Sequence, residues 1–523
     1  MTSLKKIALY KNLFLILIFF VVHAFLFNIN VAEWGDSYRI LRASESLKIG
    51  FYPLDEKRPP LFSMILATQP NFLDQITYGR SVLLVFSSAS FLIFFLLLRK
   101  YVKDEKWIFW GMLALLFNNV FLYWSLRIMT DVPFSFFVLL AVYLFGERGK
   151  SKLWLRFFTL GLVCGFAILT RFEGYLLAAA IVGAIFLEDL KLRLRKGLKI
   201  NIQSILVKAK NTIPFFISLT FVVGPYLYFR NPFSSSYLDE PSGRKYDFIM
   251  LATYLSSLLS IFGLLSAFYV IFANIKNLKK IFTQNLALSI FVILELVLIL
   301  FWPAAVPRLF VPIIPFLLIF LVSSLQVYFD QPAKNIKVAL LINLMVLGIY
   351  TVGQYLIKLQ FLILDKNIFA INLVLQLSVI WCLVQKKFKH FAVISVLAMS
   401  LWSFSIINMH KDIFISVKNA AEYAAKNFTG NVAYNDVSSV SEWYLNYQYK
   451  RAEMRGFYYN TEKKQYLNQD ALKKAGIDYL LITNEHNTTM TLDLNKRPFL
   501  DELKVFEYTV NGQEFVTRLV KVL

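Results

Sequence analysis

Carboxylates that could accept a proton lie just beyond the first apolar stretch of the chain. Asp36 stands three residues after Glu33, and apolar residues such as Ile40 and Leu41 then recur at helical spacing. This pattern predicts an amphipathic helix on the membrane surface, with Asp36 at its start. A carboxylate there could act as a general base. It could equally well only cap the free amides of the helix, and spacing alone leaves both interpretations open.

Basic residues that could bind an anion occur in the same region and at the ends of later apolar stretches. Arg58 precedes two prolines, which hold it on a stiff segment. An arginine can pair with a phosphate through two parallel hydrogen bonds, whereas an isolated basic residue at an interface more often meets a lipid headgroup. Ionisable groups cost roughly 2.5 to 3.5 kcal/mol each at membrane depth, so several on one side predict a shared pocket. The predicted pocket has Asp36 and Asp131 as candidate catalytic carboxylates, and Glu33, Arg58, Arg80, Arg127, Arg171, Glu173 and Arg308 as candidate substrate-binding residues.

Other chemical signals are weaker. Glu295 lies in the middle of an apolar run, where it could relay protons, although a buried carboxylate bonded to a neighbouring helix is the more favoured interpretation. The sequence has no zinc-type histidine spacing, no Walker loop and no dinucleotide fingerprint. It therefore calls for no cofactor, and makes no case for or against a divalent metal.

The elements that must position these residues are membrane helices. Of the 523 residues, 58% are hydrophobic and 17% are charged, against about 25% charged in soluble domains. A span needs about 20 apolar residues, and thirteen apolar runs can be traced, of which 132–146 is the shortest. This composition excludes a water-soluble enzyme and predicts about thirteen transmembrane helices.

The charge pattern predicts the orientation of these helices. The net charge is +22, but the lysines and arginines stand in short runs at alternate connections between the apolar runs, which indicates membrane topology rather than a nucleic-acid partner. We expect a cytoplasmic amino terminus and an extracytoplasmic carboxyl terminus. The predicted domains are a transmembrane module at 1–410, with a first outer loop at 29–79, and a small soluble α/β domain at 411–523, with helices at 418–427 and 469–475 and strands at 479–483, 505–510 and 515–522.

Six short motifs follow one another along the chain. They are Gly35-Asp-Ser-Tyr38, Arg58-Pro-Pro-Leu61, Arg80, Asp131-Val-Pro133, Arg171-Phe-Glu-Gly174 and Arg308 before the Pro-rich 312–315 segment. With these motifs in this order, the chain resembles the multi-spanning glycosyltransferases of the GT-C superfamily, in particular the group of protein O-mannosyltransferases and the aminoarabinose transferase of lipid A (glycosyltransferase family 39-like). The match covers roughly residues 1–330, and Ser37 departs from the Asp-Glu pair that many members carry.

This resemblance implies a function. The donor would be a sugar on a polyprenyl phosphate, and the acceptor a protein, a glycan or a lipid on the extracytoplasmic side. The protein itself would be a multi-pass protein of the cell membrane, surrounded by membrane lipids. Asp36 would be the general base, Arg58 would stabilise the leaving phosphate, and the anomeric centre would be inverted.

Two other classes of function remain open at this stage. A lipid or sugar transporter or flippase would show repeat symmetry and ionisable groups near the midplane. A membrane assembly scaffold would not need an acidic residue beside the arginines.

Overall fold

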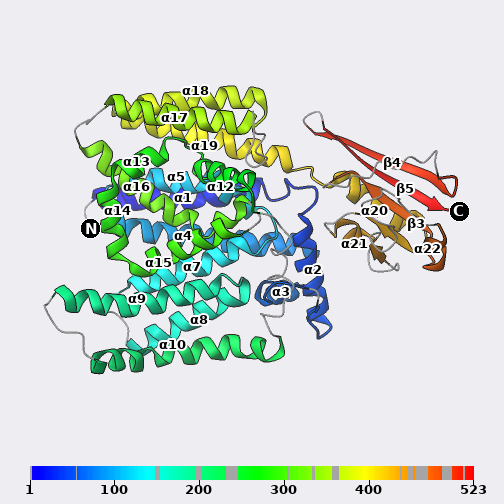
Figure 1. Ribbon diagram of the computed structural model, residues 1–523, viewed down its shortest axis with the longest axis horizontal. Coiled ribbons are helices and arrows are strands. Elements are labelled where there is room, and N and C mark those ends of the chain that lie inside the picture. Colours follow the sequence, from blue (N-terminus) through cyan, green and yellow to red (C-terminus); the bar gives the residue numbers. More distant parts are fainter. Residues whose placement is uncertain are drawn as a thin grey trace. The chain divides into compact units, whose positions relative to one another are not determined.

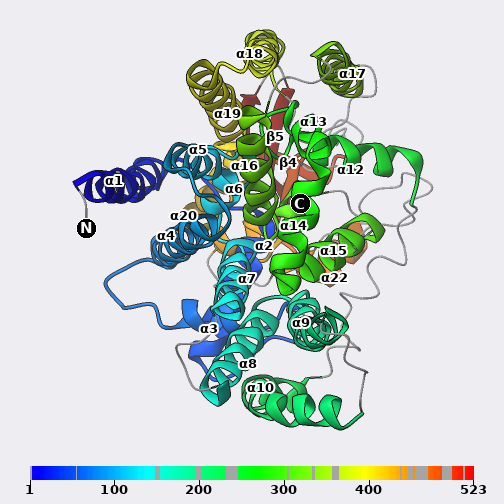
Figure 2. The same cartoon turned by 90° about the vertical axis from the view of Figure 1, so that its left-hand side faces the viewer.

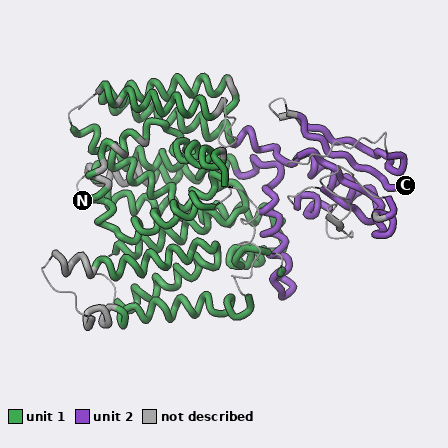
Figure 3. The backbone as a smooth tube through the Cα atoms, in the orientation of Figure 1, with its two compact units in different colours: residues 1–26, 54–406 green, residues 27–53, 407–523 purple. Residues whose placement is uncertain are grey.

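The chain forms two compact units in the computed structural model (Figure 3). Unit 1 comprises residues 1–26 and 54–406, and unit 2 comprises residues 27–53 and 407–523. The structure describes residues 3–54, 56–147, 153–195, 202–230, 246–302, 306–331, 336–355, 364–435, 439–445, 451–453, 469–485, 497–510 and 513–523.

Unit 1 is built from helices (Figures 1 and 2). Their residues are rich in Leu, Ile and Phe, and several helices place large apolar side chains on the surface, such as Phe221, which is 77% exposed, and Phe301, which is 78% exposed. Exposed apolar side chains on long helices are what a lipid-facing surface requires. The helices are α1 (Ser3–Phe25), α3 (Leu61–Ala67), α4 (Gln75–Tyr101), α5 (Glu105–Leu116), α6 (Asn119–Ser125), α7 (Asp131–Gly146), α8 (Leu153–Thr170), α9 (Gly174–Arg195), α10 (Ile202–Phe229), α12 (Phe248–Ser260), α13 (Ala267–Ala273), α14 (Ile275–Gln284), α15 (Leu286–Phe301), the 3₁₀ helix η3 (Pro307–Phe310), α16 (Ile314–Asp330), α17 (Ile336–Tyr355), α18 (Lys366–Val384) and α19 (Phe388–His410).

Five helical segments among the described residues are long and apolar enough to cross a membrane, or six if the bent pair α5 and α6 is one span. Seven shorter apolar helices accompany them. Each of the thirteen predicted apolar runs overlaps one of these helices, so the runs are helical, while the count of thirteen membrane spans stays a prediction.

Two of the predicted runs are interrupted. The run 107–124 breaks between α5 and α6 with a bend of 55°. Asn118 causes this break, because its side chain accepts hydrogen bonds from the backbone N–H groups of Val120 and Phe121, at 3.2 and 2.8 Å, and starts a new helix. The run 249–275 breaks after Ser260, where Gly263 adopts a φ of +63°, a conformation that glycine tolerates and that ends a helix.

Helices α8 and α10 pack closely along the middle of α8, the helix that precedes the candidate site. A Cβ atom at Gly161 would overlap the backbone of Phe215 and the hydroxyl of Ser218 on α10. The Ser218 hydroxyl donates a 2.7 Å hydrogen bond to the carbonyl oxygen of Phe158 across the same contact. Glycine at position 161 therefore allows the two helix backbones to approach.

Unit 2 contains a five-stranded sheet in the order β2-β1-β3-β5-β4. Strand β1 pairs in parallel with β2 and β3, while β5 is antiparallel to both β3 and β4, with Leu480 opposite Val520 in the β3–β5 register. The side chains of Ala433, Leu480 and Val520 are buried in its core. The elements of this unit are α2 (Gly35–Lys48), α20 (Ile415–Asn427), β1 (Val432–Tyr434), α21 (Val440–Tyr444), β2 (Arg451–Glu453), α22 (Gln469–Lys474), β3 (Tyr479–Thr483), β4 (Leu500–Val510) and β5 (Gln513–Val522).

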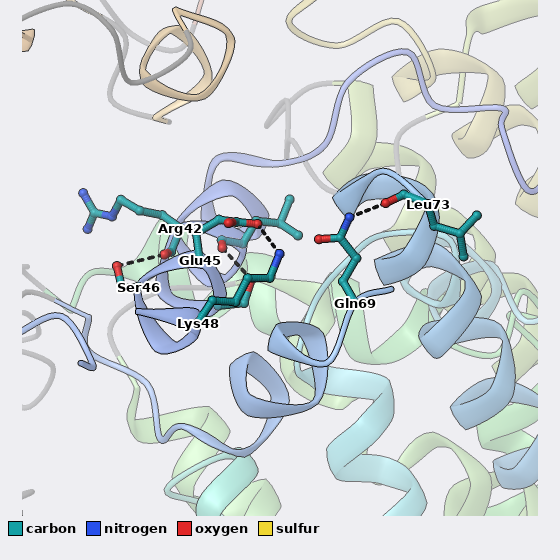
Figure 4. A network of polar contacts seen from close by, with 8 residues as sticks. Arg42, Glu45, Ser46, Lys48, Gln69 and Leu73 are labelled. Carbon is teal, nitrogen blue, oxygen red and sulfur yellow. Dashed lines mark hydrogen bonds and ion pairs between the residues drawn. The ribbon is translucent and has the colours of Figure 1, made fainter. Parts of the chain in front are cut away.

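Residues 27–53 join the carboxyl-terminal segment in this unit. The Tyr38 hydroxyl on α2 donates a 3.0 Å hydrogen bond to the Tyr444 hydroxyl on α21, and Arg42 forms a 3.1 Å ion pair with Glu442. On the outer side of α2, Lys48 pairs with Glu45 at 2.8 Å (Figure 4). The first part of the predicted outer loop 29–79, up to residue 53, is thus in the same compact unit as residues 407–523, whereas residues 54–79 belong to unit 1.

Candidate active site

Arg171 is the centre of a buried charge network in unit 1. Its Nη1 donates a 2.6 Å hydrogen bond to Oδ1 of Asp131, and its Nε donates a 3.1 Å bond to Oε1 of Glu173, to which Nη2 also donates. Asp131 has no exposed surface, and Arg171 is also buried. One guanidinium therefore bridges two carboxylates that stand 42 residues apart in the chain.

The local backbone places these three residues at helix ends. Arg171 and Glu173 occupy the turn between α8 and α9, closed by a 3.0 Å hydrogen bond from the N–H of Gly174 to the carbonyl of Arg171. A Cβ at Gly174 would overlap the backbone of Ala167 and Ile168, so only glycine fits there. Asp131 is the first residue of α7, whose first turn accepts Pro133 because the amides there lack intrahelical partners.

Asp131 is only partly satisfied by this network. Its Oδ1 accepts the bond from Arg171, whereas its Oδ2 is buried with no hydrogen-bond partner among the described residues. A buried carboxylate oxygen without a donor costs free energy. The position thus retains a hydrogen-bond acceptor that a ligand group could use.

Arg58 is fixed by a second buried carboxylate. Glu56, 1% exposed, accepts a 3.0 Å hydrogen bond from the backbone N–H of Arg58 and a 2.9 Å bond from its Nη1. Arg230, just after α10, donates to the carbonyl oxygen of Leu54 at 2.7 Å and also to the carbonyl oxygen of Glu56. The segment before the two prolines is therefore held from both sides.

Arg58, Arg171 and Arg308 line one small cleft of about 30 Å³, together with Glu173. The guanidinium of Arg308 lies 5.9 Å from the ring centre of Trp124. The remaining wall is formed by Pro59, Met129, Thr130, Thr170 and Phe172. A cleft with three guanidinium groups and few carboxylates on its wall suits an anion such as a phosphate.

A larger cavity of about 180 Å³ adjoins this cleft and shares Phe172 and Glu173 with it. The aromatic rings of Tyr175 and Trp302 and the carboxyl group of Glu295 form part of its wall. Three leucines and one isoleucine of α9, α15 and η3 complete the lining, which is mainly apolar.

Arg127 and Arg80 stand apart from the cleft lining. Arg127 is fully buried between α6 and α7, with its guanidinium 5.5 Å from the ring centre of Tyr123. Arg80 lies near the start of α4 and is half-buried. Of the predicted substrate-binding arginines, the structure brings Arg58, Arg171 and Arg308 together at the cleft.

Asp36 and Glu33 belong to unit 2. Asp36 is half-buried in the first turn of α2, and Trp34 occupies the N-cap position. Glu33 is buried, and its backbone N–H donates a 2.9 Å hydrogen bond to the Tyr38 hydroxyl. Burial, with further contributions from Tyr444 and Glu33, raises the pKa of Tyr38 well above its ordinary value, so this phenol stays neutral.

Sequence reasoning missed Glu56 and Arg230 as residues that hold the cleft. An acid two residues before Arg58 in a proline-stiffened segment was a usable signal for Glu56. No local signal pointed to Arg230, because its partners lie more than 170 residues away. Among the residues that the structure describes, no three His, Cys, Asp or Glu side chains gather in a way that could hold a metal ion.

Residues 57–207 match the family model described as dolichyl-phosphate-mannose-protein mannosyltransferase. Among curated proteins, no sequence matches the chain. Two solved structures of ArnT from Cupriavidus metallidurans are similar to this fold. The one bound to undecaprenyl phosphate has a TM-score of 0.61 at 14% identity, covering 99% of this chain and 98% of that one, and the apo form has a TM-score of 0.58 at 15% identity, covering 96% and 97%.

An archaeal oligosaccharyltransferase, AglB from Archaeoglobus fulgidus, shares the fold more distantly. Its complex with an inhibitory peptide and a dolichol phosphate has a TM-score of 0.52 at 10% identity, covering 92% of this chain and 70% of that one. The order of the six sequence motifs, the family match and the shared fold agree. Over residues 57–207 the chain is thus similar to the dolichyl-phosphate-mannose-protein mannosyltransferase family, and its fold is similar to those of ArnT and AglB.

Proposed function

We propose that the protein transfers a sugar from a polyprenyl phosphate to an acceptor hydroxyl on the extracytoplasmic side of the membrane. The observation that carries this proposal is the cleft in which Arg58, Arg171 and Arg308 converge. Their charges suit the phosphate of the donor. The bound lipid phosphates named for ArnT and AglB support the same class of donor.

In the proposed reaction, the carboxylate of Asp36 takes the proton of the acceptor hydroxyl. The acceptor oxygen forms a bond to the anomeric carbon, while the bond from that carbon to the phosphate oxygen breaks and its electron pair leaves with the phosphate. Attack opposite the leaving group inverts the anomeric centre. Arginines of the cleft stabilise the charge that develops on the phosphate.

Asp131 and Glu173 have a different role in this proposal. Asp131 lies 2.6 Å from the guanidinium of Arg171, and Glu173 contacts the same guanidinium. Both acids therefore orient Arg171 toward the cleft. Asp131 remains the alternative base if Asp36 proves dispensable.

The topology is part of the same proposal. We propose thirteen spans in a transmembrane module at 1–410 of the cell membrane, with the amino terminus in the cytoplasm. Residues 411–523 would form an extracytoplasmic domain. The acceptor would be a protein, a glycan or a lipid that reaches the outer face.

The test is sugar transfer by the purified protein in nanodiscs. Polyprenyl phosphates that carry a radiolabelled sugar are incubated with the protein, and the release of free polyprenyl phosphate is measured. A glycosyltransferase releases it in the presence of a suitable acceptor. Movement of the intact donor across vesicle membranes without any release would indicate a flippase instead.

The base is tested by Asp36→Asn, which keeps the shape of the side chain and removes its proton-accepting charge. We expect turnover to fall roughly 100-fold or more with folding intact. Glu45→Gln is the matched control, because Glu45 lies on the same helix and forms an exposed ion pair with Lys48 (Figure 4). Normal turnover in a well-folded Asp36→Asn protein would move the assignment to Asp131.

A further inference from the structure

Glu295 is a buried carboxyl group that the proposed reaction does not use. It lies in the middle of α15, is 2% exposed and lines the 180 Å³ cavity beside the arginine cleft. Its Oε2 has no hydrogen-bond partner among the described residues. An unsatisfied oxygen of this kind at a cavity wall is costly unless a ligand satisfies it.

We propose that this cavity holds the sugar ring of the donor and that Glu295 bonds to one of its hydroxyl groups. The inference rests on the proposed function and adds the place of the sugar and a specificity residue to it. In the donor, the sugar is joined directly to the phosphate, so the two groups need adjoining sites. The cavity and the cleft meet this condition, because both are lined by Phe172 and Glu173.

The composition of the wall fits a sugar. Tyr175 and Trp302 offer aromatic surface for the apolar C–H faces of the ring, and two carboxyl groups, Glu173 and Glu295, can bond to hydroxyls at its edge. The cavity has a volume of about 180 Å³.

The alternative occupant is the isoprenoid tail, which the apolar part of the lining would also accept. An isoprenoid carries no hydrogen-bond donor or acceptor of its own, so it would leave Oε2 of Glu295 buried without a partner. A sugar hydroxyl removes that cost. Glu295 thus favours the sugar over the tail.

The test compares the binding of undecaprenyl phosphate alone with that of undecaprenyl phosphates that carry mannose, glucose or xylose. The variants are Glu295→Leu, which removes the hydrogen-bonding group, and Glu295→Gln, which keeps an acceptor oxygen and most of the shape. Ser289→Ala is the control on the same helix, since the Ser289 hydroxyl donates to the backbone carbonyl oxygens of Phe282 and Asn285 and does not line the cavity. Affinity is measured for purified protein in nanodiscs.

We expect Glu295→Leu to weaken the best glycosylated lipid by about 10-fold or more, while the affinity for undecaprenyl phosphate stays within about twofold. Glu295→Gln should retain most of the affinity, and Ser289→Ala all of it. If the Leu variant does not fold, donors lacking single hydroxyls replace it: in the wild-type protein, loss of one particular hydroxyl should cost a similar factor.

Equal effects of Glu295→Leu on both lipids, or a wild-type protein that binds no glycosylated lipid more tightly than undecaprenyl phosphate, would overturn the sugar site. Failure of the underlying function has a different signature. In that case the wild-type protein would release no free polyprenyl phosphate from any of the labelled donors in the transfer assay.

Discussion

Removal of the Arg171 guanidinium should expose how much the fold depends on the buried charge network. In Arg171→Met, the side chain keeps its length, but Asp131 and Glu173 lose the cation that both contact, Asp131 at 2.6 Å. Asp131 has no exposed surface and the side chain of Glu173 is only 11% exposed, so water cannot replace the lost partner. Breaking a buried pair by removal of one partner costs about 3 to 5 kcal/mol, and we expect at least this loss in the free energy of unfolding.

The companion variant Asp131→Asn leaves Arg171 bonded to Glu173 and keeps an acceptor oxygen, so it should cost only about 1 to 3 kcal/mol. In the double variant, one of the orphaned charges is gone. The loss should therefore be smaller than the sum of the two single losses, by about 0.5 to 3 kcal/mol.

The assay is reversible unfolding of the purified protein in detergent micelles. Arg518→Met is the matched control, because Arg518 pairs with Glu502 on an exposed part of the sheet, where such a pair is worth about 1 kcal/mol or less. Additive losses in the double variant, or an Arg171→Met protein as stable as the Arg518→Met control, would refute the network as a source of stability.

Two further predictions follow from the site and from the charge pattern. Arg58→Ala should weaken donor use strongly and Arg58→Lys should restore only part of it, because a lysine is a point charge that lacks the planar fork of arginine. Steady-state kinetics with varied donor concentration measure this effect. Equal kinetics for the wild type and both variants would assign the phosphate to Arg308 or Arg80. A cysteine at the exposed position Asp501 should react with a membrane-impermeant maleimide added to intact cells, whereas one at exposed Lys106 should not. The native Cys164 and Cys382 are buried and give little background labelling. The reverse labelling pattern would overturn the proposed orientation.

Local sequence determined the helices and strands because each depends on a pattern that repeats within a few residues. The apolar runs form helices, and the short apolar segment 479–483 is strand β3. The arginine motifs were also visible, since Arg58 beside two prolines and Arg171 two residues before Glu173 are local arrangements. Helical hydrogen bonds join residues four apart, so neighbouring residues suffice to predict them.

Tertiary structure alone decided which of these charged groups meet and where the apolar runs break. Asp131 pairs with Arg171, which is 40 positions away in the sequence. Arg230 donates to the carbonyl oxygen of Glu56, and Tyr38 bonds to Tyr444 across 406 positions. The bend at Asn118 likewise involves a distant partner, the carbonyl of Ile261. Such contacts depend on how helices pack in three dimensions. The desolvation that makes a buried ion or an unpartnered oxygen costly also exists only after packing. No local pattern in the sequence therefore encodes these contacts.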